Sequence, residues 1–306
     1  MRAVSVHGPG RARVDVAALP EPRAGEVLVR IEGCGVCGSN VPVWEGRPWF
    51  GYPLPAGAPG HEGWGVVERL GEGVGGVEVG TRVAFLSERA FAEYDVARAD
   101  HLVPLPPQLD RLSVPGEALG CAVNVLRRSR VESGESIAVV GVGFLGAVVL
   151  ALAVAVGARV TAISRRPFSL DVAARLGADR TFTLDEAPDE TFACVIEAAG
   201  VQETLDLAGR LTAVRGRLVI AGYHQDGSRT VDMQLWNWRG LDVVNAHERD
   251  PEVYLEGMRA AVDAVRDDRL DLAPLVTHTF PLDRAAEALE AARTRPDGFL
   301  KAVVTP

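Results

Sequence analysis

The chain has 306 residues, of which 47% are hydrophobic and 24% charged, and its formal net charge is −9. This composition is typical of a globular protein and excludes wholesale disorder. The acidic balance and the lack of a basic cluster argue against nucleic acid or an anionic membrane as the main partner. Four cysteines are too few for a disulfide scaffold. The first residues alternate like a strand and not like a signal peptide, so we expect a cytoplasmic protein.

The first part of the chain, residues 1 to about 120, is expected to be rich in β-structure. Short alternating stretches such as Glu26–Ile31 and Gly65–Glu68 are separated by glycine and proline. The segment Leu70–Gly80 carries five glycines and predicts a turn between strands. This part therefore has the pattern of a β-domain.

The second part alternates apolar strand patterns with helical patterns. Strands are predicted at Ile137–Val140, Arg159–Ile163, Ala193–Ile196 and Arg217–Ile220, and helices at Ala147–Val156, Leu170–Leu176, Leu205–Thr212 and Pro251–Val265. Repeated strand–helix units imply a parallel, doubly wound sheet. Towards the end of the chain a helix at Ala285–Ala292 and a strand at Ala302–Val304 are predicted.

One uncharged run, Ile137–Ala158, has about the length of a membrane span. Four glycines lie inside it, and three of them have the spacing of a tight turn. A buried parallel strand that leads into a buried helix explains the run better than a membrane segment.

A glycine motif, Gly141-Val142-Gly143-Phe144-Leu145-Gly146, lies between a predicted strand and a predicted helix. In this context Gly141 would allow the tight turn, Gly143 a close approach of the backbone to a pyrophosphate, and Gly146 the packing of helix on strand. The positive end of the helix, at Phe144 and Leu145, would then face the phosphates. The alternative is a glycine-rich turn without a ligand.

The tip of the next predicted strand should decide which dinucleotide binds. A carboxylate there would bind the 2′-hydroxyl of NAD, but this chain has Ser164, Arg165 and Arg166. Guanidinium groups and a hydroxyl suit a 2′-phosphate. We therefore predict NADP(H), although two arginines in an arginine-rich chain could also occur there by accident.

Candidate metal ligands lie in the β-rich part. Cys37 follows Cys34 in a Cys-x-x-Cys pair, and His61 lies in a Gly-His-Glu-Gly segment. A thiolate, an imidazole and a carboxylate are ligands that zinc uses, and a catalytic site keeps a fourth position open. Glu117 would supply the carboxylate, or Cys121 a second thiolate. The cysteine pair also allows a redox or structural-zinc interpretation, but no second such pair exists.

Taken together, these motifs resemble the medium-chain dehydrogenase/reductase superfamily, in its zinc-dependent alcohol and polyol dehydrogenase branch. The resemblance covers essentially the whole chain, up to the ending Asp297–Lys301. It implies an α/β fold, with a Rossmann doubly wound parallel sheet in residues 124–246. A GroES-like β-rich catalytic domain would be formed by residues 1–123 and 247–306. The resemblance also implies a homodimer or homotetramer.

The resemblance assigns roles to residues of the metal site. Cys37 and His61 match the first two zinc ligands, and Glu62 matches the carboxylate beside or on the metal. Glu117 matches the third ligand as polyol dehydrogenases have it, and is preferred to Cys121. Ser39 matches the hydroxyl that passes on the proton of the alcohol.

The sequence also departs from the family pattern. Asn40 replaces an aspartate that supports the histidine ligand, and its amide oxygen is expected to accept that hydrogen bond. Pro42 replaces a relay histidine. The lobe with four cysteines is missing between Phe85 and Ala90, so one catalytic zinc and no structural zinc are expected. Lys301 falls where the family often has a basic residue near the cofactor phosphates.

The expected reaction is the reversible oxidation of a secondary alcohol, such as a polyol, sugar or cyclitol, to its ketone with NADP(H). The partner is then a small alcohol or ketone. Two alternatives are a zinc-free NADPH-dependent quinone or enone reductase of the same fold and a non-enzymatic NADPH-binding protein.

Overall fold

The protein, described here by a computed structural model of residues 1–306, divides into two compact units. The first unit comprises Met1–Gly120, Ala261–Arg266 and Val276–Pro306, and the second comprises Cys121–Ala260 and Asp267–Leu275. The first boundary lies close to the one predicted at residue 123. The second differs, because residues 247–260 belong to the second unit.

A hydrogen bond joins the two helices in which the units divide. α2 (Gly116–Ser129) and α7 (Pro251–Arg266) both cross the division between the units. On α2, Asn124 is buried and its amide donates a hydrogen bond of 3.2 Å to the carbonyl oxygen of Val253 on α7. Both residues of this contact belong to the second unit.

The first unit is built on a seven-stranded sheet with the order β14-β15-β3-β4-β5-β7, and β6 pairs with β3. Its strands are β3 (Glu26–Gly35), β4 (Glu62–Leu70), β5 (Arg82–Phe85), β6 (Tyr94–Arg98), β7 (Leu102–Pro104), β14 (His278–Pro281) and β15 (Ala302–Thr305). Two further strands, β1 (Arg2–Gly8) and β2 (Arg11–Val16), form an antiparallel pair. The predicted β-rich domain is therefore confirmed.

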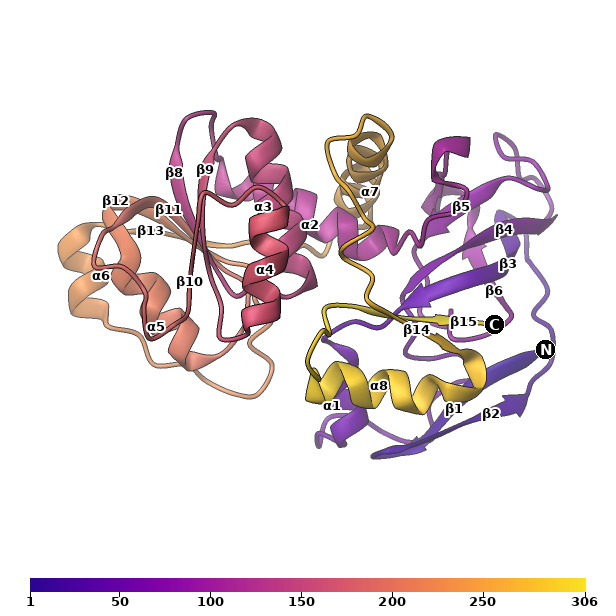
Figure 1. Ribbon diagram of the computed structural model, residues 1–306. Helices are drawn as coiled ribbons and strands as arrows, with labels where there is room; N and C mark the ends of the chain where they lie inside the picture. The colour runs from indigo at the N-terminus through magenta and orange to yellow at the C-terminus, as the bar shows by residue number, and fades with distance from the viewer. The chain divides into compact units, whose positions relative to one another are not determined.

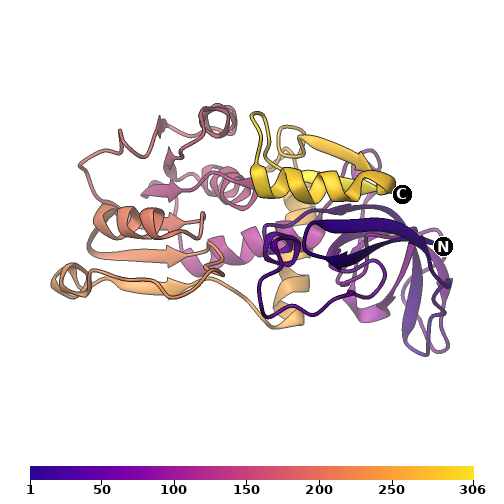
Figure 2. The ribbon, with the colours of Figure 1, turned by 90° about the horizontal axis from the view of Figure 1, so that it is seen from below.

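Both ends of the chain lie in this first unit (Figures 1 and 2). Helix α8 (Ala285–Thr294) lies beside the short helix α1 (Asn40–Glu45) (Figure 1). The 3-10 helices are η1 (Ala99–His101), η2 (Pro107–Leu109) and η3 (Leu282–Arg284). Because β15 pairs with β3 and β3 with β4, the last strand of the chain lies near the start of β4.

The second unit is a six-stranded parallel sheet with the order β10-β9-β8-β11-β12-β13. Its elements are β8 (Ser136–Val140), α3 (Phe144–Val156), β9 (Arg159–Ile163), α4 (Pro167–Arg175), β10 (Arg180–Phe182), β11 (Phe192–Glu197), α5 (Gln202–Leu211), β12 (Thr212–Ile220), α6 (Met233–Arg239) and β13 (Asp242–Asn245). This is the order of a doubly wound dinucleotide-binding sheet, so the predicted Rossmann sheet is confirmed. The strand order reverses between β8 and β11, where such sheets bind ligands.

The long uncharged run forms strand β8 and helix α3, as predicted. β8 is buried from Ile137 onward, and α3 is buried over most of its length. α3 ends at Gly157, which adopts the left-handed conformation with a φ of 93°. No helix combines the length and the apolar character that crossing a membrane requires.

One predicted boundary in the second unit is wrong. The helix expected to include Thr212 ends at Leu211, and Thr212 begins β12, which starts well before the predicted Arg217. The buried hydroxyl of Thr212 donates to the carbonyl oxygen of Ala208 at 2.7 Å and closes the end of α5. A β-branched residue with a local hydrogen bond fits either element, so the sequence pattern alone did not separate them.

Candidate functional site

Three predicted site residues come together in the first unit. The ligand atoms of Cys37, His61 and Glu62 all lie within 4.8 Å of one another. Cys37 follows β3, and the other two precede and begin β4, which pairs with β3 through Gly35 and Glu62. One sulfur, one ring nitrogen and one carboxylate oxygen form a donor set that suits zinc. These residues fit a zinc ion.

A backbone carbonyl orients the ring of His61. Its Nδ1 lies 2.9 Å from the carbonyl oxygen of Pro59, which can only accept, so Nδ1 carries the hydrogen and Nε2 is left for a metal. Ser39 Oγ lies 3.4 Å from this Nε2. The expected bond from His61 to Asn40 is wrong. Asn40 accepts from the backbone N–H of Cys37 at 2.9 Å and donates to Pro59 at 3.0 Å, so it fixes the carbonyl that holds the ring.

Negative charge gathers around His61. Burial by itself lowers the pKa of this imidazole. The hydrogen bond to Cys37 and the charge of its thiolate raise it, and the carboxylates of Glu117 and Glu62 add to this, so that the pKa reaches about 10. A cluster that favours a cation this strongly also suits a divalent metal ion.

The two cysteines of the Cys-x-x-Cys pair have different surroundings. Cys34 is fully buried in the hydrophobic core, and burial raises the pKa of its thiol well above the usual value. Cys37 is partly exposed and is the one that joins the metal cluster. Since both thiols are free, Cys34 acts as a core residue and Cys37 as a metal-ligand candidate.

Lys301 forms a buried ion pair with Glu62. Its Nζ donates to Oε1 at 2.7 Å and lies 2.5 Å from Oε2, which accepts no hydrogen bond. Burial lowers the pKa of Lys301, but the charges of Glu62, Cys37 and Glu117 and the hydrogen bond to Glu62 together outweigh it and raise the pKa above its usual value. This arrangement differs from the expected place near cofactor phosphates, because β15 carries the lysine to the start of β4.

Gly35 leaves the space in which this ion pair forms. A Cβ atom at this position would lie 1.8 Å from Oε2 of Glu62 and 3.0 Å from Cε of Lys301. The register explains this, because Gly35 lies opposite Glu62 on one side and Val303 on the other. Any larger residue would push the carboxylate out of the cluster.

Glu117, the predicted third ligand, begins helix α2 and lies outside the group of three. Its charge nevertheless raises the pKa of both His61 and Lys301, so it acts on the same cluster. Cys121, the alternative ligand, belongs to the second unit. The assignment of Glu117 as a ligand stays a prediction.

In the second unit, the glycine turn has the geometry that a dinucleotide requires. Gly141 has a φ of 101°, and a Cβ there would lie 2.7 Å from the backbone nitrogen of Ala199. At Gly146 a Cβ would lie 2.0 Å from the carbonyl oxygen of Gly141, so only glycine lets α3 pack on the turn. Around Gly143, the N-cap of α3, there is open space. Phe144 and Leu145 form the first turn of that helix.

The predicted cofactor-selecting residues lie next to this turn. The backbone N–H of Gly141 donates to the carbonyl oxygen of Ile163, the last residue of β9, and Ser164 follows. Ser164 is buried, and its hydroxyl lies 3.5 Å from the backbone nitrogen of Arg166. The exposed guanidinium of Arg165 lies 3.9 Å from Glu203, a weak pair that a phosphate could displace.

Comparisons with known proteins agree with this geometry. Residues 23–107 match the model of the alcohol dehydrogenase GroES-like domain, and residues 145–263 match that of the zinc-binding dehydrogenases. The sorbitol dehydrogenase of Gallus gallus is 28% identical over 95% of this chain and 93% of its own length. The chain belongs to the medium-chain dehydrogenase/reductase superfamily. It is an alcohol dehydrogenase-like oxidoreductase of the polyol and alcohol branch.

Two solved structures share the fold of this superfamily member over 100% of its chain and 99% of theirs. A zinc-binding dehydrogenase from Sinorhizobium meliloti bound to NADP has a TM-score of 0.88 at 24% identity. An alcohol dehydrogenase from Escherichia coli complexed with NADH has a TM-score of 0.89 at 22% identity. At this identity the likeness concerns the fold alone.

The sequence did not point to Lys301 as a partner of Glu62, although a signal was present. Lys301 is the single lysine among 32 basic residues. Arginine is used at all other basic positions, so one exception marks a place where a compact ammonium fits and a guanidinium does not. The place is the buried space beside Gly35.

We expect Lys301→Met to destabilise the metal-free protein by about 3 kcal/mol or more, because it leaves the buried carboxylate of Glu62 unpaired. Chemical denaturation at neutral pH measures this change in the free energy of unfolding. The double variant Glu62→Gln/Lys301→Met should recover much of the loss, since neither charge is then buried alone. Equal losses in the single and double variants would contradict the ion-pair argument. Arg293→Met, which breaks an exposed pair with Glu290, is the control and should change stability little.

Proposed function

We propose that the protein is a zinc-dependent NADP(H) oxidoreductase that interconverts a secondary alcohol and its ketone. The observation that supports this most directly is the convergence of Cys37, His61 and Glu62 within 4.8 Å. A hydroxyl, that of Ser39, lies next to the ring of His61. Polyols, sugars and cyclitols are the proposed substrate class, because the curated relatives that match nearly the whole chain are sorbitol dehydrogenases.

The charge balance favours Glu117 as the third zinc ligand. Lys301 pairs with Glu62 and compensates part of its charge, and Glu62 raises the pKa of His61 less than Glu117 does. A zinc ion held by the Cys37 thiolate and neutral His61 would keep one positive charge. A second anionic ligand would remove it, and Glu117 already acts electrostatically on the cluster. Glu62 would then lie beside the metal and keep its ion pair with Lys301.

The chain's own residues would bind and deprotonate the alcohol. Zinc, when bound, acts as a Lewis acid on the alcohol oxygen and makes its proton easier to remove. Ser39 would accept that proton through its hydroxyl, which lies 3.4 Å from Nε2 of His61. Pro42, inside α1, has no group that can carry the proton further, so the proton must leave by another route.

NADP(H) is the proposed cofactor because of the residues after β9. The fold accommodates either dinucleotide, as NADP and NADH in the two solved structures illustrate. The choice therefore depends on side chains, and Ser164, Arg165 and Arg166 include no carboxylate for a 2′-hydroxyl. Their donors suit a 2′-phosphate. The proposed assembly is a homodimer or homotetramer, which sedimentation would distinguish from a monomer.

Glu117→Ala should weaken zinc binding by more than about 100-fold, which exceeds the usual effect of an outer-shell partner. Cys121→Ala, one turn later on the same helix, is the matched control and should retain zinc. Metal analysis of protein purified without chelator, followed by competition with a chromogenic chelator, measures both. If Cys121→Ala loses more zinc affinity than Glu117→Ala does, the third ligand is Cys121.

The same metal analysis tests the rival functions. Substoichiometric zinc together with intact ketone or enone reduction would favour a zinc-free reductase. Full activity of Cys37→Ser would also contradict a zinc mechanism. NADPH binding without turnover over a broad panel of alcohols and ketones would indicate a protein that only binds the dinucleotide.

Arg165→Asp should lower the ratio of kcat/KM for NADPH to that for NADH by about 100-fold, because a phosphate partner is replaced by a partner for a hydroxyl. Steady-state kinetics with both cofactors and one alcohol substrate measures this ratio. Arg175→Gln removes an exposed arginine at the end of α4 and serves as the control, with an unchanged ratio. An unchanged ratio in Arg165→Asp would refute the assignment.

A further inference from the structure

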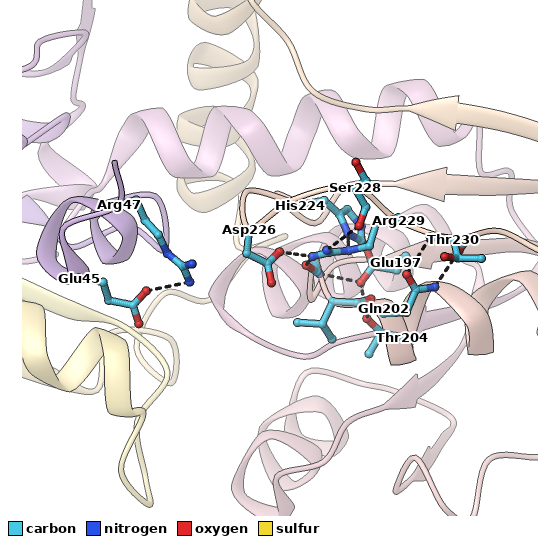
Figure 3. A network of polar contacts seen from close by, with 12 residues as sticks. Glu45, Arg47, Glu197, Gln202, Thr204, His224, Asp226, Ser228, Arg229 and Thr230 are labelled. Atoms are coloured by element: carbon cyan, nitrogen blue, oxygen red, sulfur yellow. Dashed lines mark hydrogen bonds and ion pairs between the residues drawn. The ribbon is translucent and has the colours of Figure 1, made fainter. Parts of the chain in front are cut away.

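A second fully buried carboxylate lies in the second unit, at the end of β11 (Figure 3). Oε1 of Glu197 accepts hydrogen bonds from the backbone N–H groups of Ala199 and Gly200, both at 2.8 Å. It also accepts one from the hydroxyl of Thr204 at 2.7 Å. Oε2 lies 3.0 Å from Nε2 of His224. The carboxylate thus joins the loop after β11 to the loop after β12.

The bonds around His224 fix its protonation state. Nε of Arg229 is always a donor, and it lies 2.8 Å from Nδ1 of His224. Nδ1 must therefore accept, so the hydrogen of the neutral ring is on Nε2 and is donated to Glu197. The result is a chain of carboxylate, imidazole and guanidinium in which His224 is neutral. Its side chain is only 14% exposed.

This chain fastens the loop after β12 to the loop after β11 (Figure 3). Arg229 donates to the carbonyl oxygen of Gly200 at 3.0 Å and also pairs with Asp226. Next to it, the amide of Gln202 makes two hydrogen bonds to the backbone of Thr230, at 2.7 and 3.0 Å. The link through the imidazole is therefore one of three side-chain links, with those of Arg229 and Gln202, that hold the loop after β12.

The fastened loops border the predicted dinucleotide site. Glu197 lies opposite Val140, the last residue of β8, and the glycine turn follows. A Cβ at Gly141 would touch Ala199, so the turn and the loop after β11 are in direct contact. In a doubly wound sheet the first half binds one mononucleotide and the second half the other. The glycine turn and Ser164 belong to the first half, so the loops after β11 and β12 belong to the nicotinamide half.

We propose that His224 is a positioning residue of the cofactor site, which as a neutral imidazole holds the loop after β12 where it receives the nicotinamide half of the dinucleotide. This rests on the dinucleotide-dependent function proposed above. The reaction needs the nicotinamide ring in one orientation, and the chain from Glu197 to Arg229 fixes the backbone on which it rests.

Acid should open this link. A proton on Nδ1 of His224 would remove the acceptor for Arg229 and place two cations side by side. The charged groups that face the ring are Glu197 from β11 and Arg229, with Asp226 behind it, from its own loop. A second histidine, His247, stacks on the neighbouring Tyr223 with ring centres 6.0 Å apart and needs a separate control.

The test is the affinity for NADPH, measured by its fluorescence from about pH 8 to pH 5.5, the range in which imidazole changes charge. His224→Leu should weaken NADPH binding about tenfold at the upper end, as expected for a lost buried hydrogen bond to a charged group. It should leave the affinity for adenosine 2′,5′-bisphosphate unchanged, because that ligand has no nicotinamide half. His224→Gln can donate to Glu197 and accept from Arg229 without titrating. It should therefore bind like the wild type at the upper pH and lose less affinity on acidification.

Controls separate this proposal from the function on which it rests. His247→Gln should keep the pH profile of the wild type. If the wild type binds neither NADPH nor NADH, the proposed function fails and the role of His224 with it. If the wild type binds NADPH but His224→Gln retains the full pH response, only the positioning role is overturned. The comparison of the wild type with His224→Gln tests the positioning role even if His224→Leu fails to fold.

Discussion

A buried ion pair between distant parts of the chain determines the geometry of the metal site. Glu62 is 0% exposed and Lys301 is 4% exposed, and either charge alone would be costly to bury. They meet beside Gly35, where β3 offers no side chain. The pair ties the end of the chain to the start of β4, directly after the histidine ligand. The C-terminal strand therefore supplies the charge that lets Glu62 stay buried beside Cys37 and His61.

The same pair shapes the metal preference of the site. With the charge of Glu62 compensated, the donors that dominate are the thiolate of Cys37 and the imidazole of His61. Hard cations such as magnesium and calcium prefer sites made mainly of oxygen ligands. Sulfur and nitrogen donors suit zinc, and a single further carboxylate does not change this preference. Under the proposed function, Lys301 would act on metal selection although it cannot bind a metal.

Local sequence patterns predicted most elements of the second unit. They could not predict the side-chain contacts of the metal site, which join residues far apart in the sequence. The strand, turn and helix around Gly141 could be predicted, because the apolar pattern and the glycine spacing that indicate them extend over only a few residues. The partner of Lys301 lies 239 residues away, and only the register of three strands brings the two together. The role of Asn40 was also wrong, because it acts through the carbonyl of Pro59 and no residue pattern reports where a backbone carbonyl points.

Each unit contains a buried carboxylate held by a base from a later part of the chain, but the two bases behave differently. The ammonium of Lys301 stays charged, because the negative charges of Glu62, Cys37 and Glu117 together raise its pKa against the effect of burial. The base on Glu197 is the imidazole of His224, which is neutral because its Nδ1 accepts a hydrogen bond from Arg229. The metal cluster is therefore held by a link between two full charges, and removing either one leaves the other buried alone. The loops of the dinucleotide unit are held by a neutral ring between a carboxylate and a guanidinium, and this link is lost when His224 can no longer accept from Arg229.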